Sequence, residues 1–198
     1  MDHDTPSAWV GRFIPLIRPG GRVLDLAAGA GRHTTLLLDM GFAVTAIDRD
    51  IANLRPLAGG KCDVRTLDLE TGAPESALGS LGGFDGVVVT NYLHRPLFAP
   101  IAAALAPDGV LIYETFAVGN ERFGRPRNPE FLLRRGELIE AFAALTIVAF
   151  EEGEVRLPRP AFIQRIAAIA GPLARLPEAD TELDATRRQA GGEPVPAA

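Results

Sequence analysis

Short apolar runs separated by turn residues recur along most of the chain. Strands are predicted where such runs are brief, at 22–27, 43–48, 62–69, 84–91 and 110–116. Helices are predicted where apolar residues recur every three or four positions, at 7–17, 32–40, 97–105 and 135–144. The unbroken run from Val87 to Val89 predicts a strand buried on both faces. Strands that alternate with helices predict an α/β fold: a doubly wound, mostly parallel sheet with helices on both faces.

The second half of the chain is less regular. A turn is predicted at 106–109, and the segment 117–133, which contains Gly, Pro and Arg, is predicted to be a long loop. The run 145–155 predicts a sixth strand, whereas 161–170 is compatible with a strand or a helix. Residues 172–198 are rich in Pro, Ala, Gly and charge, which predicts a mobile tail after a single domain at 1–171.

Composition argues against several functional classes. The 198 residues carry a formal net charge of -5, which disfavours nucleic acid as a general partner. One cysteine and three scattered histidines provide neither a disulfide nor metal-ligand spacing, so no metal site is predicted. No apolar window approaches the roughly 20 residues of a membrane span, and the acidic start "MDHDTPS" lacks the apolar run of a secretory signal. The expected location is therefore the cytoplasm, and the oligomeric state stays open.

The stretch "DLAAGAGRHT" predicts a ligand-binding loop between the first strand and a helix. A phosphate-binding P-loop needs a lysine that this stretch lacks. A dinucleotide fingerprint needs a third glycine where Thr34 stands, and Asp25, four residues before Gly29, would repel a pyrophosphate. S-adenosylmethionine carries an ammonium and a sulfonium and has no phosphate. An acid followed by Gly29 and Gly31 therefore suits it better than NAD.

Two further acids follow predicted strands at the same edge of the sheet. Asp48 ends the second predicted strand, where a carboxylate can accept hydrogen bonds from both ribose hydroxyls. Because NAD enzymes use the same arrangement, Asp48 indicates adenosine without choosing between the cofactors. Asp68, in "LDLE", is placed to accept a hydrogen bond from the adenine amino group. Plainer interpretations exist, namely a tight glycine turn, a helix-capping Asp25 and a solvated Asp68, but the order and spacing together favour a cofactor site.

Taken in order, these segments resemble the motifs of the class I S-adenosylmethionine-dependent methyltransferases. The similar stretches cover about residues 20–116 and are "VLDLAAGAG", "AVTAIDRD", "TLDLE", "FDGVVVTNYLHRPLF" and "LAPDGVLIYETF". One departure is Ala27, which stands where the family usually has glycine. The segment from Glu114 onward also resembles a bacterial subgroup of small methyltransferases, grouped loosely with the tellurite-resistance type.

The resemblance implies S-adenosylmethionine as cofactor and a Rossmann-like sheet of seven strands. Its last strand would be antiparallel, which would make both 145–155 and 161–170 strands. On the same motifs, the resemblance adds five residues to the expected cofactor site: Ala27, Arg49, Leu69, Thr90 and Asn91. It does not indicate the methyl acceptor.

Candidate catalytic residues lie in "TNYLHRP" (90–96), where the family usually places residues that face the acceptor. Because the sulfonium methyl is already activated, a general base is needed only for an acceptor with a tightly held proton. Histidine titrates near neutrality, so His94 is the candidate base, with Tyr92 beside it in the pocket; helix capping and packing are the alternatives. The predicted function is methyl transfer to a small, anionic or soft acceptor. The alternatives are a nucleic-acid methyltransferase, an NAD-linked oxidoreductase and a non-catalytic cofactor-binding module.

The segment 117–135 carries five arginines and two glutamates, a net charge of +3. Arginine binds carboxylates and oxyanions in bidentate fashion, so this segment is predicted to be a lid whose Arg125 and Arg127 serve an anionic acceptor. Solvated charge and internal salt bridges are the alternative. His33 is predicted to be a surface or loop residue near the cofactor's carboxylate, and Cys62 a structural residue.

Overall fold

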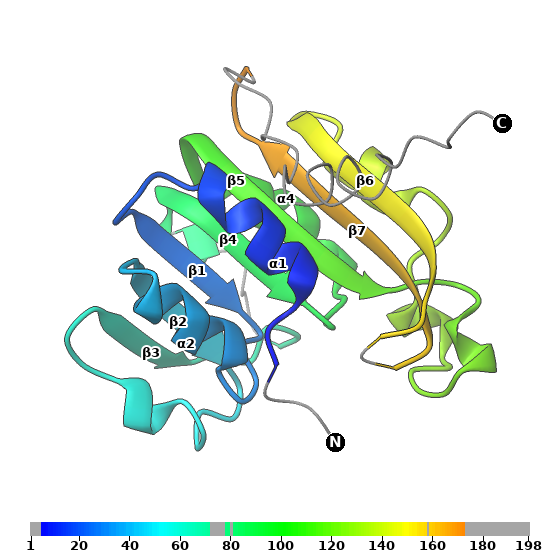
Figure 1. Cartoon of the computed structure of the whole chain (residues 1–198), viewed down its shortest axis with the longest axis horizontal. Coiled ribbons are helices and arrows are strands. Elements are labelled where there is room, and N and C mark those ends of the chain that lie inside the picture. The colour runs from blue at the N-terminus through cyan, green and yellow to red at the C-terminus, as the bar shows by residue number, and fades with distance from the viewer. Residues whose placement is uncertain (1–4, 72–77, 80, 158, 173–198) are drawn as a thin grey trace, which may run out of the picture.

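Seven strands form one sheet at the centre of the protein (Figure 1). The computed structural model describes residues 5–71, 78–79, 81–157 and 159–172. The strands are β1 (Arg22–Leu26), β2 (Ala43–Asp48), β3 (Cys62–Thr66), β4 (Phe84–Thr90), β5 (Leu105–Phe116), β6 (Thr146–Val155) and β7 (Ala161–Ile169). Their order is β3-β2-β1-β4-β5-β7-β6. Six strands run in the same direction, and β7 runs opposite to them, antiparallel to both β5 and β6. The predicted doubly wound, mostly parallel sheet is confirmed, and 161–170 is resolved as a strand.

Some boundaries differ from those that the apolar runs predicted. The third strand ends at Thr66, so Asp68 lies in the loop beyond it. The predicted turn at 106–109 instead lies within β5 as an irregularity, because Phe84 pairs with Leu105 but Gly86 pairs with Val110. The predicted loop contains two short 3-10 turns, Asn120–Arg122 and Pro129–Phe131.

Helices cover both faces of the sheet, as predicted. On one face lie α1 (Ala8–Phe13), which continues into a 3-10 turn at Ile14–Leu16, and α2 (Arg32–Asp39) (Figure 1). On the other lie α4 (Phe98–Ala103), after a 3-10 turn at Arg95–Leu97, and α5 (Glu137–Ala141), both shorter than predicted. The Ser7 hydroxyl accepts hydrogen bonds from the N–H groups of Trp9 and Val10, which caps α1 as expected. The β2–β3 connection holds a 3-10 turn at Arg55–Leu57.

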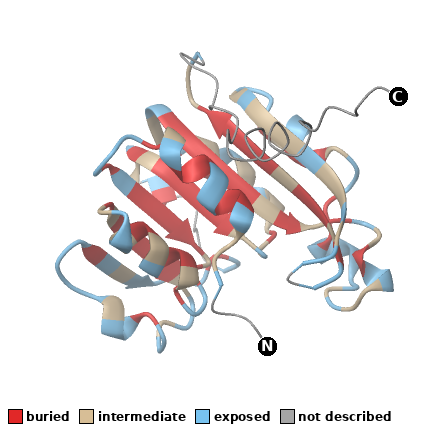
Figure 2. Cartoon of the chain, viewed as in Figure 1, coloured by how far each residue is buried: buried red, intermediate tan, exposed pale blue. Residues whose placement is uncertain are grey.

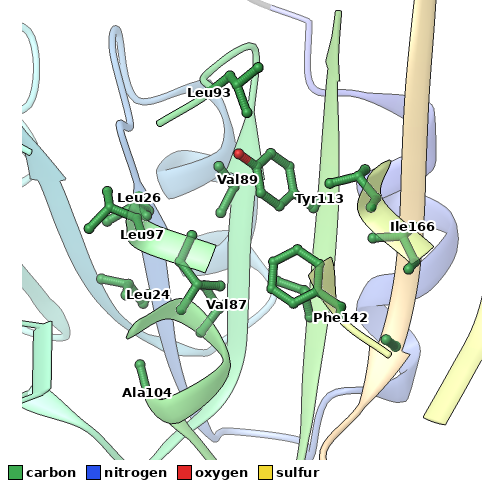
Figure 3. Packing of buried hydrophobic residues seen from close by; sticks show 14 of the residues in the cluster. Leu24, Leu26, Val87, Val89, Leu93, Leu97, Ala104, Tyr113, Phe142 and Ile166 are labelled. Carbon is green, nitrogen blue, oxygen red and sulfur yellow. The ribbon is translucent and has the colours of Figure 1, made fainter. Parts of the chain in front are cut away.

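Two apolar clusters, one on each face of the sheet, form most of the core. Val87 and Val89 pack on the α4–α5 face with Tyr113 and Phe142, whose ring centroids are 6.0 Å apart (Figure 3). Val88 points the other way and packs against α1. All three valines are 0% exposed, which confirms the predicted burial on both faces. At about 2 kcal/mol for each fully buried side chain, such positions stabilise the centre of the sheet (Figure 2).

The strand order reverses beside β1, because β2 lies on one side of it and β4 on the other. The carboxyl ends of parallel strands share one edge, and in such sheets ligands bind beyond that edge where the order reverses. The glycine-containing segment 27–31 leaves β1 at this point, so the fold places the predicted cofactor loop where a crevice is expected.

Two predictions concern the chain as a whole. In the described ranges, no helix combines the length and apolar content needed to cross a membrane. From residue 173 onward the predicted tail lies outside the described residues, so the single-domain boundary at 171 stays a prediction.

Candidate functional site

The loop between β1 and α2 is shaped by three left-handed residues. Ala27, Gly29 and Gly31 have φ values of 55°, 56° and 83°. At Gly31, a Cβ atom would approach Leu54 Cδ2 to 2.8 Å, so both the backbone conformation and the space require glycine. Ala27 occupies a conformation that L-residues adopt reluctantly. The loop therefore brings its backbone close to the carboxyl edge of the sheet.

A pocket of about 170 Å³ opens beside this loop. Its lining comes from the ends of β1, β2 and β4 and from the residues after β3: Ala27, Asp48, Arg49, Leu67, Asp68, Leu69, Glu70 and Tyr92. Six of these were predicted site residues. Leu67 and Glu70 were not named beforehand, although they are the first and last residues of the quoted "LDLE" stretch.

Asp48 joins the pocket to the glycine loop. Its Oδ2 accepts a hydrogen bond from the Gly29 N–H at 2.8 Å, and its Oδ1 accepts one from the Asp50 N–H at 3.0 Å. A carboxylate offers about four lone-pair positions, so both oxygens can still accept further hydrogen bonds. Asp48 is thus oriented by the backbone and remains available to a ligand.

Asp68 and Tyr92 face the same pocket from different elements. Asp68 Oδ1 accepts a hydrogen bond from the Glu70 N–H at 2.9 Å, and this contact holds the pKa of Asp68 below its ordinary value. The Tyr92 hydroxyl is buried and has no hydrogen-bond partner among the described residues. Burial, together with the neighbouring Glu70 and Asp68, raises the pKa of Tyr92. Because buried polar groups are nearly always paired, this protonated hydroxyl is an unusual feature of a residue that lines the pocket.

Asp25 does not line the pocket. It is 1% exposed, and its Oδ2 accepts a hydrogen bond from the Thr34 hydroxyl at 2.6 Å. Burial raises the pKa of Asp25 to about 6. The structure thus places the Asp25 side chain against α2, and its predicted contact with a cationic ligand stays a prediction. The alternation of β1 explains this placement, because residue 25 points to the same face as Val23, where α2 lies.

His33 differs from expectation, because it is buried in a network with Ser7 and Thr90 on the α1–α2 face, whereas the cofactor contact expected of Thr90 stays a prediction. The Ser7 N–H donates to His33 Nε2 at 3.0 Å, and His33 Nδ1 lies 3.3 Å from the Thr90 hydroxyl. Nε2 accepts a hydrogen bond, so the ring proton is on Nδ1 and points to Thr90. His33 is 2% exposed, and burial lowers its pKa to about 4. It is thus a neutral internal residue rather than a surface one.

Glu114 extends this network to β7. The Ser7 hydroxyl donates to Glu114 Oε1 at 2.9 Å, and Arg165 Nη1 donates to Glu114 Oε2 at 3.1 Å. The N-terminal segment before α1 is therefore fastened to the carboxyl edge of the sheet. Nothing in the spacing of Ser7 and Glu114 indicated this contact, because 107 positions separate them.

Asn91 and His94 lie beyond the end of β4, outside the pocket lining. Asn91 is exposed, has a φ of 54°, and donates its N–H to the Glu114 carbonyl at 2.9 Å. His94 is half-buried and immediately precedes the 3-10 turn at Arg95–Leu97. The structure thus brings Tyr92 into the pocket but not His94, whose catalytic role stays a prediction.

Comparison with known proteins agrees with this geometry. No family model matches the chain. The protein-L-isoaspartate O-methyltransferase of Chlorobaculum tepidum is 30% identical over 124 residues, which are 62% of this chain and 54% of that relative. The chain therefore spans about half the length of that curated relative.

Two solved structures are similar over 83% of this chain. One is TehB from Haemophilus influenzae, with a TM-score of 0.67, 18% identity and 62% of that chain covered. The other is the Burkholderia thailandensis 1,6-didemethyltoxoflavin-N1-methyltransferase, solved with bound 1,6-didemethyltoxoflavin and S-adenosylhomocysteine, with a TM-score of 0.60, 25% identity and 77% of that chain covered. The chain has the class I S-adenosylmethionine-dependent methyltransferase fold. The resemblance to that family is confirmed, because solved methyltransferase structures share the fold and a curated methyltransferase is similar in sequence.

In the class I methyltransferase fold of this chain, the described site has two parts. The pocket at the ends of β1 to β4 is polar and acidic, since it holds Asp48, Asp68 and Glu70 against Arg49. The network around His33 lies on the α1–α2 face and is internally satisfied. The first part is available for ligand recognition, whereas the second positions the backbone around it.

Proposed function

We propose that the chain binds S-adenosylmethionine and transfers its methyl group to a small acceptor. The observation that carries this proposal is the pocket beside the glycine loop, with Asp48 at the end of β2, Asp68 beyond β3 and the unpaired Tyr92 hydroxyl in its wall. A shared fold alone does not establish an activity, so the argument rests on these side chains.

The pocket residues suit an adenosine group. Asp48 can accept hydrogen bonds from the ribose hydroxyls with the lone pairs that Gly29 and Asp50 leave free. Leu67 and Leu69 offer apolar surface to a purine ring, and Asp68 offers an acceptor to its amino group. Tyr92 lines the same pocket, and its hydroxyl has no hydrogen-bond partner among the described residues.

The charge of the pocket favours S-adenosylmethionine over NAD. Three carboxylates and one guanidinium line it, so a diphosphate would meet a net negative wall. A ligand that carries an ammonium and a sulfonium is attracted by the same wall. The oxidoreductase alternative is disfavoured for this reason.

When bound, S-adenosylmethionine supplies an activated methyl group, which passes to the acceptor atom while its sulfonium becomes a thioether. The chain then needs mainly to orient the two partners and to exclude water. Tyr92 acts as a hydrogen-bond donor rather than a base, because its raised pKa keeps the hydroxyl protonated at neutral pH. An acceptor with a tightly held proton would need His94, which lies two residues beyond Tyr92 along the chain.

Isothermal titration with S-adenosylhomocysteine tests cofactor binding, with NADH titrated in parallel. We expect micromolar affinity for S-adenosylhomocysteine, about -8 kcal/mol. Asp48→Ala should weaken it by roughly 1.5–3 kcal/mol, because the ribose hydroxyls lose a charged acceptor. Asp39→Ala is the matched control, since it removes an exposed carboxylate at the far end of α2.

Absence of heat with millimolar S-adenosylhomocysteine, or binding of NADH in its place, would refute the cofactor assignment. A cofactor that binds equally well to the Asp48→Ala variant would show that the pocket is not the site. Release of S-adenosylhomocysteine from S-adenosylmethionine in the presence of a metabolite panel then separates an enzyme from a non-catalytic binding module.

A further inference from the structure

A second, wider hollow lies at the end of β5, away from the acidic pocket. Its volume is about 640 Å³, within the range of roughly 300–1,000 Å³ that is usual for small-molecule sites. The rings of Phe116, Pro126 and Phe131 give it apolar walls, and three guanidinium side chains, Arg125, Arg127 and Arg159, border it. We call this hollow the arginine groove.

The structure separates the arginines of segment 117–135 into two groups. Arg122 donates to the Gly119 carbonyl at 3.1 Å, and Arg134 and Arg135 lie 3.4 and 3.7 Å from carboxylates of Glu137 and Glu152. Arg134 and Arg135 thus form salt bridges of the kind that the alternative expected, whereas Arg122 makes a local hydrogen bond to the backbone. The remaining two, Arg125 and Arg127, face the arginine groove.

Within the described residues, no carboxylate neutralises the positive charge of the arginine groove. None of Arg125, Arg127 and Arg159 lies within 4.0 Å of a carboxylate in the described part of the chain. The described lining of the groove also contains no carboxylate. In a chain with a net charge of -5, this is a concentrated cationic position beside exposed aromatic surface, since Phe131 is 48% exposed.

The backbone that carries these arginines is held in place from both sides. Buried Asn120 donates to the Pro126 carbonyl at 3.1 Å and accepts from the Phe162 N–H at 3.2 Å. Arg95, from the other face, donates to the Glu130 and Leu132 carbonyls at 2.9 Å each. The groove is therefore preorganised, which reduces the entropy lost when a ligand binds.

The arginine groove and the acidic pocket share the carboxyl edge of the sheet. Phe116 stands two residues beyond Glu114, which pairs with Thr90 on the adjacent strand. With strands about 4.8 Å apart and about 3.3 Å per residue, Phe116 lies about 8 Å from the end of β4. Arg159 reaches the same place from the β6–β7 connection, which Figure 1 shows beside the 117–135 segment. The Ala117 N–H donates to the carbonyl of Phe162, which lies at the start of β7 just after this connection.

We propose that the arginine groove holds the methyl acceptor, and that this acceptor is a small molecule with a carboxylate or phosphate on an apolar, ring-containing body. The anionic group pairs with the guanidinium forks, and the apolar body packs between Phe116 and Phe131. The acceptor role rests on the proposed function, whereas the anion site does not. A nucleic acid fits less well, because the three arginines form one cluster beside apolar walls rather than a stripe along the surface.

A fluorescence titration of the full chain with 1-anilinonaphthalene-8-sulfonate, an anionic aromatic probe, tests the groove without turnover. We expect Arg125→Ala/Arg127→Ala and, separately, Arg159→Ala to weaken probe binding by at least about tenfold. Arg156→Ala is the matched control, because Arg156 is exposed, lies three positions before Arg159 in the sequence and does not line the groove. The affinity of this variant for the probe should stay within twofold of the wild type. Phenyl phosphate and benzoate should displace the probe, and neutral benzyl alcohol should not.

Three results would overturn the inference: unchanged probe affinity in both arginine variants, equal displacement by benzyl alcohol, or displacement by a short oligonucleotide at lower concentration than phenyl phosphate. Thermal unfolding of each variant confirms that it is folded, and the two variants change different segments. Titration with S-adenosylhomocysteine should give the same affinity in wild type and variants. If the wild type fails to bind S-adenosylhomocysteine but shows the arginine-dependent probe site, the proposed function fails while the anion site stands.

Discussion

Asp25 and His33 should impose opposite pH dependences on stability within one narrow window. Burial raises the pKa of Asp25 from 3.8 to about 6, so its favourable contribution is present below pH 3.8 and is lost as the pH rises through 6. Burial lowers the pKa of His33 from 6.5 to about 4, so its unfavourable contribution is present at low pH and disappears as the pH rises through 6.5. The two contributions therefore change in opposite directions between pH 4 and 6.5.

The magnitudes follow from about 1.4 kcal/mol for each pKa unit. Complete titration of either group changes the free energy of unfolding by about 3 kcal/mol. Between pH 4.5 and 7, each contribution changes by about 2 kcal/mol. In the wild type these nearly cancel. Asp25→Asn should therefore leave a stability that rises with pH by about 2 kcal/mol, and His33→Gln one that falls by about the same amount.

Urea unfolding at intervals between pH 4.5 and 7 measures these slopes. Asp85 and Glu137 are among the other carboxylates whose pKa values are lowered in the folded protein. The stability that they contribute is lost mainly below pH 4.5, and this loss is the same in the wild type and in both variants. The double variant should regain the shallow wild-type slope. An Asp25→Asn profile parallel to that of the wild type would refute the reasoning, because it would mean that the buried carboxyl does not titrate in this range.

Two further predictions concern stability. Gly86→Ala should destabilise the fold by about 1–3 kcal/mol in urea unfolding, because its Cβ would lie 2.6 Å from Ile17 Cδ1 in the buried face against α1; full stability would contradict this packing. Glu137→Gln should lose about 2 kcal/mol, because the buried carboxylate that accepts from Arg95 Nε at 2.6 Å and from the Arg134 N–H at 2.6 Å would no longer balance Arg95. Glu140→Gln, on the exposed side of α5, is its control and should change stability by less than about 0.5 kcal/mol.

Local signals in the sequence were enough to predict much of the fold. The apolar runs predicted β2 at its observed bounds and the burial of Val87 to Val89, because strand periodicity and turn residues act over a few neighbouring positions. The glycine loop and the place of Asp48 at the end of β2 were also predictable from neighbouring residues. Left-handed positions favour glycine, and Asp48 directly follows an apolar run. The antiparallel direction of β7 came from the family resemblance and not from its own pattern, because a strand buried on both faces lacks the alternation that separates it from a helix.

The direction of individual side chains and the contacts between distant segments were decided only by the tertiary structure. Asp25 points to α2 because of its parity along β1, and His33 is buried because the N-terminal segment folds over it. The grouping of Arg159 with Arg125 and Arg127 has no local signal, since it exists only once the β6–β7 connection lies beside the 117–135 segment. A sequence pattern reports the environment of neighbouring residues, whereas these sites depend on how separate elements pack against one sheet edge.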